Sequence, residues 1–257
     1  MQGSIARCYG GMVDVKAGRG VLLLEDIPAA EQGDVLRGCT EEGSLAALAV
    51  LARLHACSWK ETDDAHPARM PRWGARPMAP DLWLDRLARA GERFPEIVTH
   101  TFMSRVVDLP EKVAVALDDL RSGPASWLQL DAHLDNVLWR ADRTAVLLDW
   151  CNAAIGPPIA DVVRFLSEGV DVESRPVLLN AYMREIRSSG ADADPSDTEA
   201  SLQVALLPLL QSAVGWAGRE DLRPHGRKAD VCARWLQSVS NWALDDDSRS
   251  QVGSSPV

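Results

Sequence analysis

The chain has 257 residues, of which 46% are hydrophobic, and its formal net charge is -10. A chain of this length can bury a core as one large domain or two small ones, and its composition is that of an ordinary globular protein. The acidic balance argues against nucleic acid as a partner. It would suit a cationic substrate, although many globular proteins are acidic without binding one.

The cysteines and the apolar segments bear on the cellular location. The five cysteines are scattered, without the spacing of a disulfide framework or a zinc site, which predicts a reducing, cytoplasmic compartment. The N-terminal residues show no apolar segment of the signal-peptide kind. The most apolar helix candidate, 202–216, carries Gln203, Gln211 and Ser212, so we expect a buried helix and no membrane partner.

The first third of the chain predicts one strand and one helix. Residues 1–20 are rich in glycine, and the apolar run 20–25 then predicts a buried strand. Thr40 precedes two glutamates and is a favourable N-cap. Leucines at every third position from Leu45 predict a helix of about 15 residues that ends near Trp59.

Prolines punctuate the remaining helical segments. Residues 60–80 are rich in proline, aspartate and arginine and predict a surface loop. Proline is tolerated in the first turn of a helix, so we expect helices that begin at Pro80, Pro95 and Pro110. Helical periodicity returns after residues 157 and 158. Four helices are expected there, at 158–169, 173–188, 196–217 and 226–244.

Between these helical halves lies a β-rich stretch, residues 127–161. Strands are expected at 127–130, 137–139 and 145–148, with polar turns at 131–136 and 140–143. The predicted fold class is therefore α+β, mostly helical, with a small β cluster whose turns carry polar residues.

Three side chains of this stretch, Asp131, Asn136 and Asp149, are expected to converge at strand ends. Mg²⁺ prefers oxygen ligands and keeps several waters, so Asn136 and Asp149 suffice where substrate phosphates supply the rest. Asp131 is a separate carboxylate that can orient a hydroxyl and accept its proton. Phosphoryl transfer requires mainly positioning and charge neutralisation, and this short set meets that requirement.

Aspartate and asparagine are also common in turns, so only the complete pattern indicates a site. It comprises D-x-H-x-x-N from Asp131, an apolar strand that ends at Asp149-Trp150, then Gly-Pro-Pro and Asp161. This stretch resembles the catalytic region of the aminoglycoside phosphotransferase and choline-kinase-like families, which share the protein-kinase-like fold. The likeness extends from about residue 5 to about residue 245 and is specific only at 127–161.

The resemblance implies transfer of the γ-phosphate of ATP, with Mg²⁺, to a hydroxyl of a small-molecule acceptor. It assigns Asp131 as the catalytic residue and Asn136 and Asp149 as the metal ligands. His133 and Asp161 then support the loop, His133 through a hydrogen bond within it and Asp161 by bracing it from the next helix.

The resemblance also covers the start of the chain. The apolar run before Asp26 matches the last strand of the N-lobe as it enters the hinge, where backbone groups near Glu25 and Ile27 would meet adenine. Residues 51–55 match the helix that follows, and His55 is expected to be a capping or core histidine.

One departure from the family pattern concerns the loop. The family has His-Gly-Asp where this chain has Gln129-Leu130-Asp131. Glutamine can replace a hydrogen bond, whereas leucine adds a side chain where the backbone turns tightly and predicts strain. We expect weakened rather than abolished chemistry.

The other departure concerns the N-lobe. In this fold the phosphate-gripping loop and its lysine precede the hinge, but here fewer than 25 residues do, and Lys16 is their only lysine. We expect 1–26 to be a remnant of the N-lobe sheet and hinge with an exposed apolar face, 27–245 the helical C-lobe, and 246–257 a disordered tail. The chain is then either a fragment of a longer kinase or a degenerate relative.

Three functions remain open at this point. The first is a small-molecule phosphotransferase, and the second is an inactive pseudokinase or binding module that keeps the C-lobe. The third, a metallophosphoesterase, is suggested by the D-x-H of Asp131 to His133 but lacks that family's downstream motifs. The nine tryptophans indicate packing rather than a cation cage. Neither the acceptor nor an oligomeric state is specified by the sequence.

Overall fold

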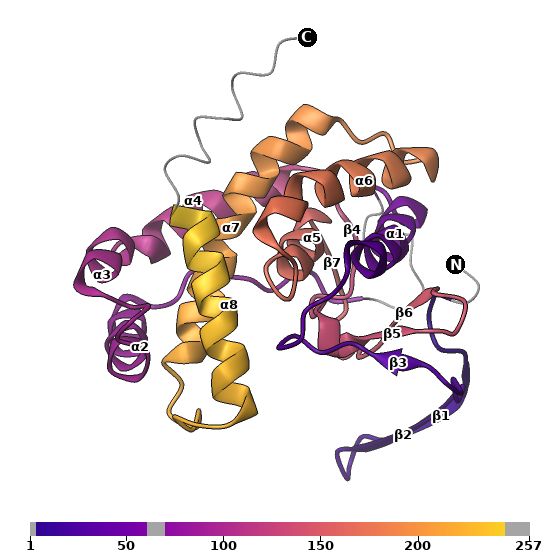
Figure 1. Ribbon diagram of the computed structural model, residues 1–257, viewed down its shortest axis with the longest axis horizontal. Coiled ribbons are helices and arrows are strands. Elements are labelled where there is room, and N and C mark those ends of the chain that lie inside the picture. The colour runs from indigo at the N-terminus through magenta and orange to yellow at the C-terminus, as the bar shows by residue number, and fades with distance from the viewer. Residues whose placement is uncertain (1–3, 61–69, 245–257) are drawn as a thin grey trace.

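The computed structural model describes residues 4–60 and 70–244, shown in Figure 1. Residues 61–69, within the expected surface loop, and the expected tail at 246–257 lie outside the described residues. The described chain is mostly helical with small sheets, which confirms the predicted α+β class. Its helices are α1 (Glu41–Cys57), α2 (Pro80–Arg93), α3 (His100–Val106), α4 (Leu109–Ser122), α5 (Ile159–Leu166), α6 (Arg175–Ser188), α7 (Pro195–Ala217) and α8 (Arg227–Leu244).

Local capping signals placed most helix starts correctly. The Thr40 side chain accepts a hydrogen bond from the Gly43 N–H at 3.2 Å, so it caps α1 as predicted. The prediction that Pro95 begins a helix was wrong. Helix α3 begins at His100, after Thr99, whose hydroxyl accepts from the Phe102 N–H and satisfies an N–H that the helix leaves free.

Helix α7 forms the centre of the helical region and packs against α2, α4, α5 and α8. The expectation of a buried helix at 202–216 is confirmed, because most of the α7 side chains there are buried. In the described chain, α7 is the one helix whose length and apolar composition would allow it to cross a membrane. Of its most apolar window, 56% is buried against the rest of the protein, as in a core helix.

The strands form three small sheets. β1 (Cys8–Asp14) pairs with β2 (Arg19–Leu24), and β4 (Ser126–Leu128) pairs with β7 (Ala154–Gly156), both antiparallel. The third sheet has the order β3-β5-β6, with β3 at Glu31–Gln32, β5 at Val137–Trp139 and β6 at Ala145–Leu147. The sequence predicted β2, β4, β5 and β6 and missed the other three strands.

Helix α1 brings two of these sheets together, because it packs against both β4 and β6. The expected surface loop 60–80 also joins the structure: the Trp73 N–H donates to the Ile155 carbonyl, and the Ile155 N–H donates to the Pro71 carbonyl. This part of the loop therefore extends the β4-β7 sheet rather than lying free on the surface.

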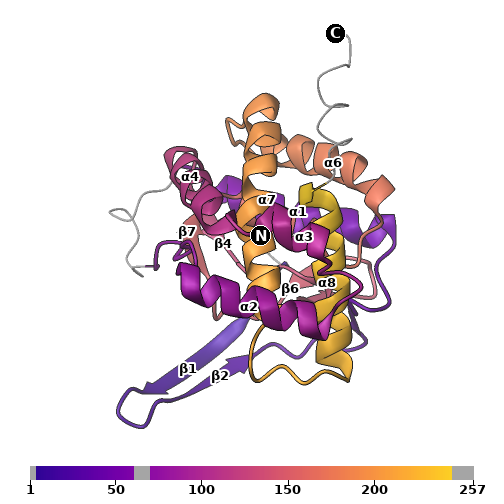
Figure 2. The same cartoon turned by 90° about the vertical axis from the view of Figure 1, so that its left-hand side faces the viewer.

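The hairpin of β1 and β2 extends from the body of the protein (Figures 1 and 2). The prediction of a buried strand here was wrong, since every residue of β1 and β2 is exposed and Leu22 retains 67% of its accessible surface. A continuous apolar run does not reveal whether another element covers it. The exposed apolar strands agree with the expectation that this segment leaves an apolar face uncovered.

The segment after β3 lies against the loop that joins β4 to β5. Gln32 Nε2 donates to the Asp135 carbonyl at 2.8 Å, and the Val35 N–H donates to Asp135 Oδ1 at 2.9 Å. Between them, a Cβ on Gly33 would overlap the Leu134 carbonyl oxygen and lie 2.8 Å from the Trp139 ring. Glycine is therefore required for this close approach of two backbones.

Replacing Gly33 with alanine is expected to lower the free energy of unfolding by about 1–3 kcal/mol, because the new methyl group has no space. Urea denaturation measures this. Gly74→Ala is the control, since a Cβ there meets nothing within 4 Å, and it should change the free energy by less than about 0.5 kcal/mol. Equal free energies of unfolding for the two variants would show that the backbone around Gly33 can move to accommodate the methyl group without loss of stability.

Candidate active site

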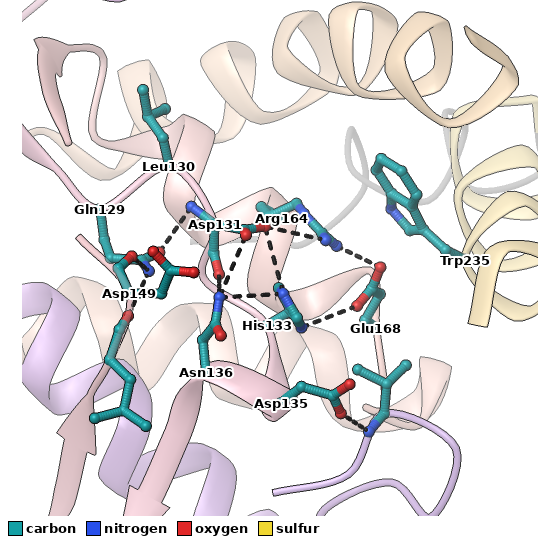
Figure 3. A network of polar contacts seen from close by, with 12 residues as sticks. Gln129, Leu130, Asp131, His133, Asp135, Asn136, Asp149, Arg164, Glu168 and Trp235 are labelled. Carbon is teal, nitrogen blue, oxygen red and sulfur yellow. Dashed lines mark hydrogen bonds and ion pairs between the residues drawn. The ribbon is translucent and has the colours of Figure 1, made fainter. Parts of the chain in front are cut away.

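The candidate site is built on residues 129–136, named here the central loop, which leaves β4 and enters β5 (Figure 3). Its last turn is a short 3₁₀ helix, Leu134–Asn136. The predicted strand at 127–130 ends at Leu128, because the next two N–H groups turn toward a carboxylate instead of a neighbouring strand.

That carboxylate belongs to Asp161, in the first turn of α5, and it is fully buried. Its Oδ2 accepts from the Gln129 N–H and its Oδ1 accepts from the Leu130 N–H, both at 2.7 Å. Buried His55 lies 3.3 Å from Oδ2 through Nε2, and its Nδ1 lies 2.8 Å from the Tyr182 hydroxyl. Asp161 therefore hydrogen-bonds the central loop from α5, and His55 is a core histidine.

The side chain of Gln129 also holds the loop, through hydrogen bonds named here the Gln129 clamp. It is fully buried, and its Nε2 donates to the carbonyl oxygens of Leu148 and Asp149 at 2.8 and 2.7 Å. Its Oε1 accepts from the Asp131 N–H at 2.7 Å. One amide therefore links the backbone of the central loop to the turn after β6, as expected for a glutamine that supplies hydrogen bonds here.

The backbone strain expected at Leu130 is present, since its φ is 64° in the left-handed region. A non-glycine residue there costs on the order of 1–2 kcal/mol. The two hydrogen bonds to Asp161 and the Gln129 clamp hold the turn in this conformation. Asp149 also has a positive φ, 53°, at a position that tolerates it better, because aspartate visits this region more readily than leucine.

Asp131 projects from the loop into a polar network. Its Oδ1 lies 3.4 Å from His133 Nε2 and 3.5 Å from Arg164 Nη2, and its Oδ2 accepts from Asn136 Nδ2 at 3.3 Å. Burial alone raises the pKa of Asp131, but the hydrogen bond and charge of His133, with Arg164 and Asn136, more than offset it. The pKa lies below its ordinary value, so the carboxylate is ionised at neutral pH.

Asn136 and Asp149 leave oxygen atoms available. Asn136 Nδ2 also donates to the Asp131 carbonyl at 3.0 Å, which commits the amide nitrogen and leaves its oxygen as an acceptor. The exposed Asp149 carboxylate accepts a 3.3 Å bond from the Cys151 N–H and has no ion pair among the described residues. Hydrogen bonding to Asp149 is the largest cause of a raised pKa at the Cys151 thiol, consistent with an uncompensated negative charge.

These two residues fit a hard divalent cation, because one amide oxygen and one unpaired carboxylate are oxygen ligands of the preferred kind. Within residues 4–60 and 70–244, no group of three or more His, Cys, Asp or Glu side chains is placed to hold a metal. A cation at Asn136 and Asp149 would therefore need further oxygen ligands from phosphate or water.

A model of the phosphotransferase enzyme family matches residues 5–195. The chain belongs to the phosphotransferase enzyme family. The predicted recognition is thereby confirmed, and the match extends well beyond the stretch 127–161 that carried it.

Solved structures share the fold of this family member. A microcompartment-associated aminopropanol kinase is 17% identical with a TM-score of 0.64, over 96% of this chain and 76% of that chain. A choline/ethanolamine kinase family protein from Mesorhizobium loti is 16% identical with a TM-score of 0.59, over 97% and 76%. The amicoumacin kinase hAmiN, solved with AMP-PNP, Ca²⁺ and Ami, is 13% identical with a TM-score of 0.53, over 94% and 70%. No curated protein matches the chain.

Two site residues of this phosphotransferase family member escaped the sequence analysis, Arg164 and Glu168. Arg164 Nη1 forms an ion pair with Glu168 Oε1 at 2.5 Å, and its guanidinium lies 4.3 Å from the centre of the Trp235 ring. The Glu168 side chain is 1% exposed and also lies 3.8 Å from His133 Nδ1. The i, i+4 spacing of Arg164 and Glu168 is typical of an ion pair on a helix. Nothing in the local sequence predicts that Arg164 also contacts Asp131.

The two predicted hinge residues are not joined to the central loop. Among the described residues no hydrogen bond or ion pair connects Glu25 or Ile27 with 129–136. Glu25 Oε1 lies 3.1 Å from Arg140 Nη2, and Glu25 Oε2 accepts from the Arg7 N–H at 3.1 Å. The Arg7 hydrogen bond is the largest cause of its lowered pKa, with Arg140 adding to it. Their contact with adenine stays a prediction.

A cleft of about 640 Å³ lies beside Asp131. Leu130, Asp131 and His133 line it from the central loop, and Trp216 of α7 and Trp235 of α8 line it from the helices. The ionised carboxylate therefore faces a space large enough for a small molecule.

Replacing Gln129 with leucine keeps the volume of the side chain but removes three hydrogen bonds. Two carbonyl oxygens and one N–H would then lose a buried partner, so the free energy of unfolding should fall by about 2–4 kcal/mol. Chemical denaturation measures this loss. Gln203→Leu, at a half-buried position of α7 for which the described structure gives no side-chain hydrogen bond, is the control and should change stability little. A harmless Gln129→Leu would show that the clamp does not stabilise the loop.

Leu130 provides a paired test of the strained turn. Leu130→Gly and Leu130→Ala both remove the side chain, but only glycine relieves the positive φ. The glycine variant should be more stable than the alanine variant by about 1 kcal/mol in thermal or urea unfolding. At exposed Leu82 of α2 the same pair should show the opposite order, since glycine weakens a helix. The same order at both positions would argue against strain at Leu130.

Proposed function

We propose that this chain transfers the γ-phosphate of ATP to a hydroxyl of a small-molecule acceptor, with Mg²⁺ as the metal. Membership of the phosphotransferase enzyme family supports the reaction class. The observation that carries the proposal is the geometry around the Gln129 clamp. The central loop presents an ionised carboxylate and a free amide oxygen beside a cleft, and the clamped turn after β6 presents an unpaired carboxylate. That set matches what phosphoryl transfer requires.

Asp131 accepts the hydrogen bond of the acceptor hydroxyl and points its oxygen at the phosphate. Its lowered pKa makes it a weak base, which suits a loose transition state in which positioning contributes more than early proton removal. His133 and Arg164 hold the carboxylate in place from one side, and Asn136 holds it from the other.

Asn136 and Asp149 are the residues that would hold Mg²⁺. Bound there, the cation would neutralise charge on the phosphate oxygens and orient them. The Gln129 clamp fixes the distance between the two ligands, because it bonds the backbone of both the central loop and the turn at Asp149. The complex of hAmiN with AMP-PNP and Ca²⁺ supports a nucleotide and a divalent ion in this fold.

The adenine contacts and the two lobes are inferred from the resemblance to the aminoglycoside phosphotransferase and choline-kinase-like families. Backbone groups near Glu25 and Ile27 would meet adenine, with residues 1–26 as N-lobe sheet and hinge and 27–245 as the C-lobe. We also propose a cytoplasmic location, which the ATP requirement of the proposed reaction supports.

A second candidate, a binding module without catalysis, is favoured by one observation. All residues of β1 and β2 are exposed, and Lys16, in the turn between them, has no side-chain partner in the described structure that would hold it over the site. A kinase lysine that contacts phosphate is ordinarily held on a strand by a glutamate. Nucleotide binding separates the two candidates.

AMP-PNP with Mg²⁺ is expected to raise the melting temperature of the wild-type chain, because ligand binding stabilises the folded state. Asn136→Ala and Asp149→Ala should reduce that rise, whereas Asp142→Asn, in an exposed turn, should leave it unchanged. A wild-type chain that shows no shift at millimolar nucleotide would favour the binding module.

Asp131→Asn tests the chemistry separately. The amide keeps the shape of the side chain but loses the negative charge that orients the acceptor hydroxyl and takes up its proton, so transfer from ATP to any acceptor found by screening should fall by about 10²–10⁴-fold. ADP release and the labelled product measure transfer, and the nucleotide-dependent melting shift confirms that the variant is folded. Unchanged turnover would remove Asp131 from the reaction.

A further inference from the structure

The charges that line the cleft beside Asp131 point to a particular class of acceptor. Building on the proposed function, we propose that the acceptor carries an anionic group beside a flat apolar body, and that Arg76 binds the anionic group. The acidic composition of the chain would suit a cationic substrate, but the charges that line this cleft favour an anion.

The walls of the cleft favour a flat apolar body. Trp73 of the 70–79 segment, Trp216 of α7 and Trp235 of α8 all line it. The ring centres of Trp216 and Trp235 lie 5.9 Å apart at an interplanar angle of 59°. Aromatic faces and edges in this arrangement bury planar carbon skeletons well.

These tryptophans do not form an empty cage for a cation. The guanidinium of Arg164 lies 4.3 Å from the centre of the Trp235 ring, so a cation already covers one aromatic surface of the cleft (Figure 3). A quaternary ammonium or amine placed there would meet this like charge at close range.

The carboxylate that lines the cleft already has partners. Among the described residues that line it, Asp131 is the only carboxylate, and it contacts His133, Arg164 and Asn136. A cationic acceptor group would therefore find no free carboxylate except the one assigned to the hydroxyl.

The arginines that line the cleft differ in whether their guanidinium groups have partners. Arg164 pairs with Glu168, and Arg219 forms two 2.7 Å hydrogen bonds to Asp221. Arg76 is exposed, and its guanidinium has no hydrogen bond or ion pair in the described structure. The one uncommitted charge in this wall is therefore positive, and a guanidinium binds carboxylate or phosphate through two parallel hydrogen bonds.

The backbone that carries Arg76 is fixed on α7. Gln211 Nε2 donates to the Arg76 carbonyl at 3.0 Å, and Gln211 Oε1 accepts from the Met78 N–H at 2.9 Å. Gln211 is itself 6% exposed, so this clamp is protected from water. Arg76 thus combines a held backbone with a free head group, which reduces the ordering cost of binding an anion.

The unused hydrogen-bonding groups of the cleft agree with this assignment. The indole N–H groups of Trp73 and Trp216 have no hydrogen-bond partner among the described residues, and both are donors only. Donors of this kind match the oxygen atoms of an anion and offer nothing to an ammonium group.

Three para-substituted benzyl alcohols test the inference, because the same benzyl alcohol carries an anionic, a neutral or a cationic group: 4-(hydroxymethyl)benzoate, 1,4-benzenedimethanol and 4-(hydroxymethyl)phenyltrimethylammonium. Their binding to the full chain is measured by calorimetry at low salt without nucleotide. The benzoate should bind at least about fivefold more tightly than the diol and the ammonium compound more weakly than either. Added salt should weaken only the benzoate toward the diol.

Variants assign the effect to one residue. Arg76→Gln should weaken the benzoate at least about fivefold and leave the diol unchanged. Arg184→Gln is the matched control, since Arg184 is an exposed arginine of α6 that has no ion pair in the described structure and does not line the cleft. It should leave all three affinities unchanged.

The inference is overturned if the ammonium compound binds as tightly as the benzoate, if Arg76→Gln leaves the benzoate affinity unchanged, or if none of the three compounds binds. Each of these results leaves the proposed phosphotransferase reaction intact, because no nucleotide or transfer step enters the measurement. Conversely, a chain that binds no nucleotide, or an Asp131→Asn variant with unchanged turnover, would contradict the proposed reaction. Neither result would change the order in which the three benzyl alcohols bind.

Discussion

A buried carboxylate that must be hydrogen-bonded fixes the conformation of the central loop. Asp161 lies in the first turn of α5 without access to water, where an unpaired charge would cost several kcal/mol. It is satisfied by two backbone N–H groups of the loop and by His55 of α1. Because these partners come from the loop and from α1 while Asp161 itself belongs to α5, the three elements can adopt this arrangement only together.

The strain and the chemistry of the site follow from that constraint. Two adjacent N–H groups reach one carboxylate only if the backbone turns sharply, and Leu130 accepts a positive φ as a result. Gln129 then fills the buried side of the turn, and Asp131 emerges on the side of the cleft. Strain of this size persists where surrounding hydrogen bonds over-determine the conformation. The position of the ionised carboxylate is therefore set by buried groups that do not line the cleft.

Local charge in this protein differs from the average charge. The chain as a whole is acidic, yet the charged side chain without a partner in the cleft wall is Arg76, and the ionised carboxylate of Asp131 already contacts His133 and Arg164. Screening confines such fields to roughly 8–10 Å at physiological salt, so the groups that line a cleft matter more than net charge for what binds there. Composition alone is accordingly a poor guide to the acceptor of a phosphotransferase.

The sequence by itself determined the helix starts with a proper cap, such as Thr40, the fold class and the motif residues Asp131 and Asn136. Caps and turns act within a few residues, so a linear pattern records them. Only the tertiary structure decided that β2 is exposed and that Arg164 contacts Asp131. It also decided that tryptophans far apart in the chain line one cleft with Arg76. These outcomes depend on which elements pack together, and no local propensity encodes that.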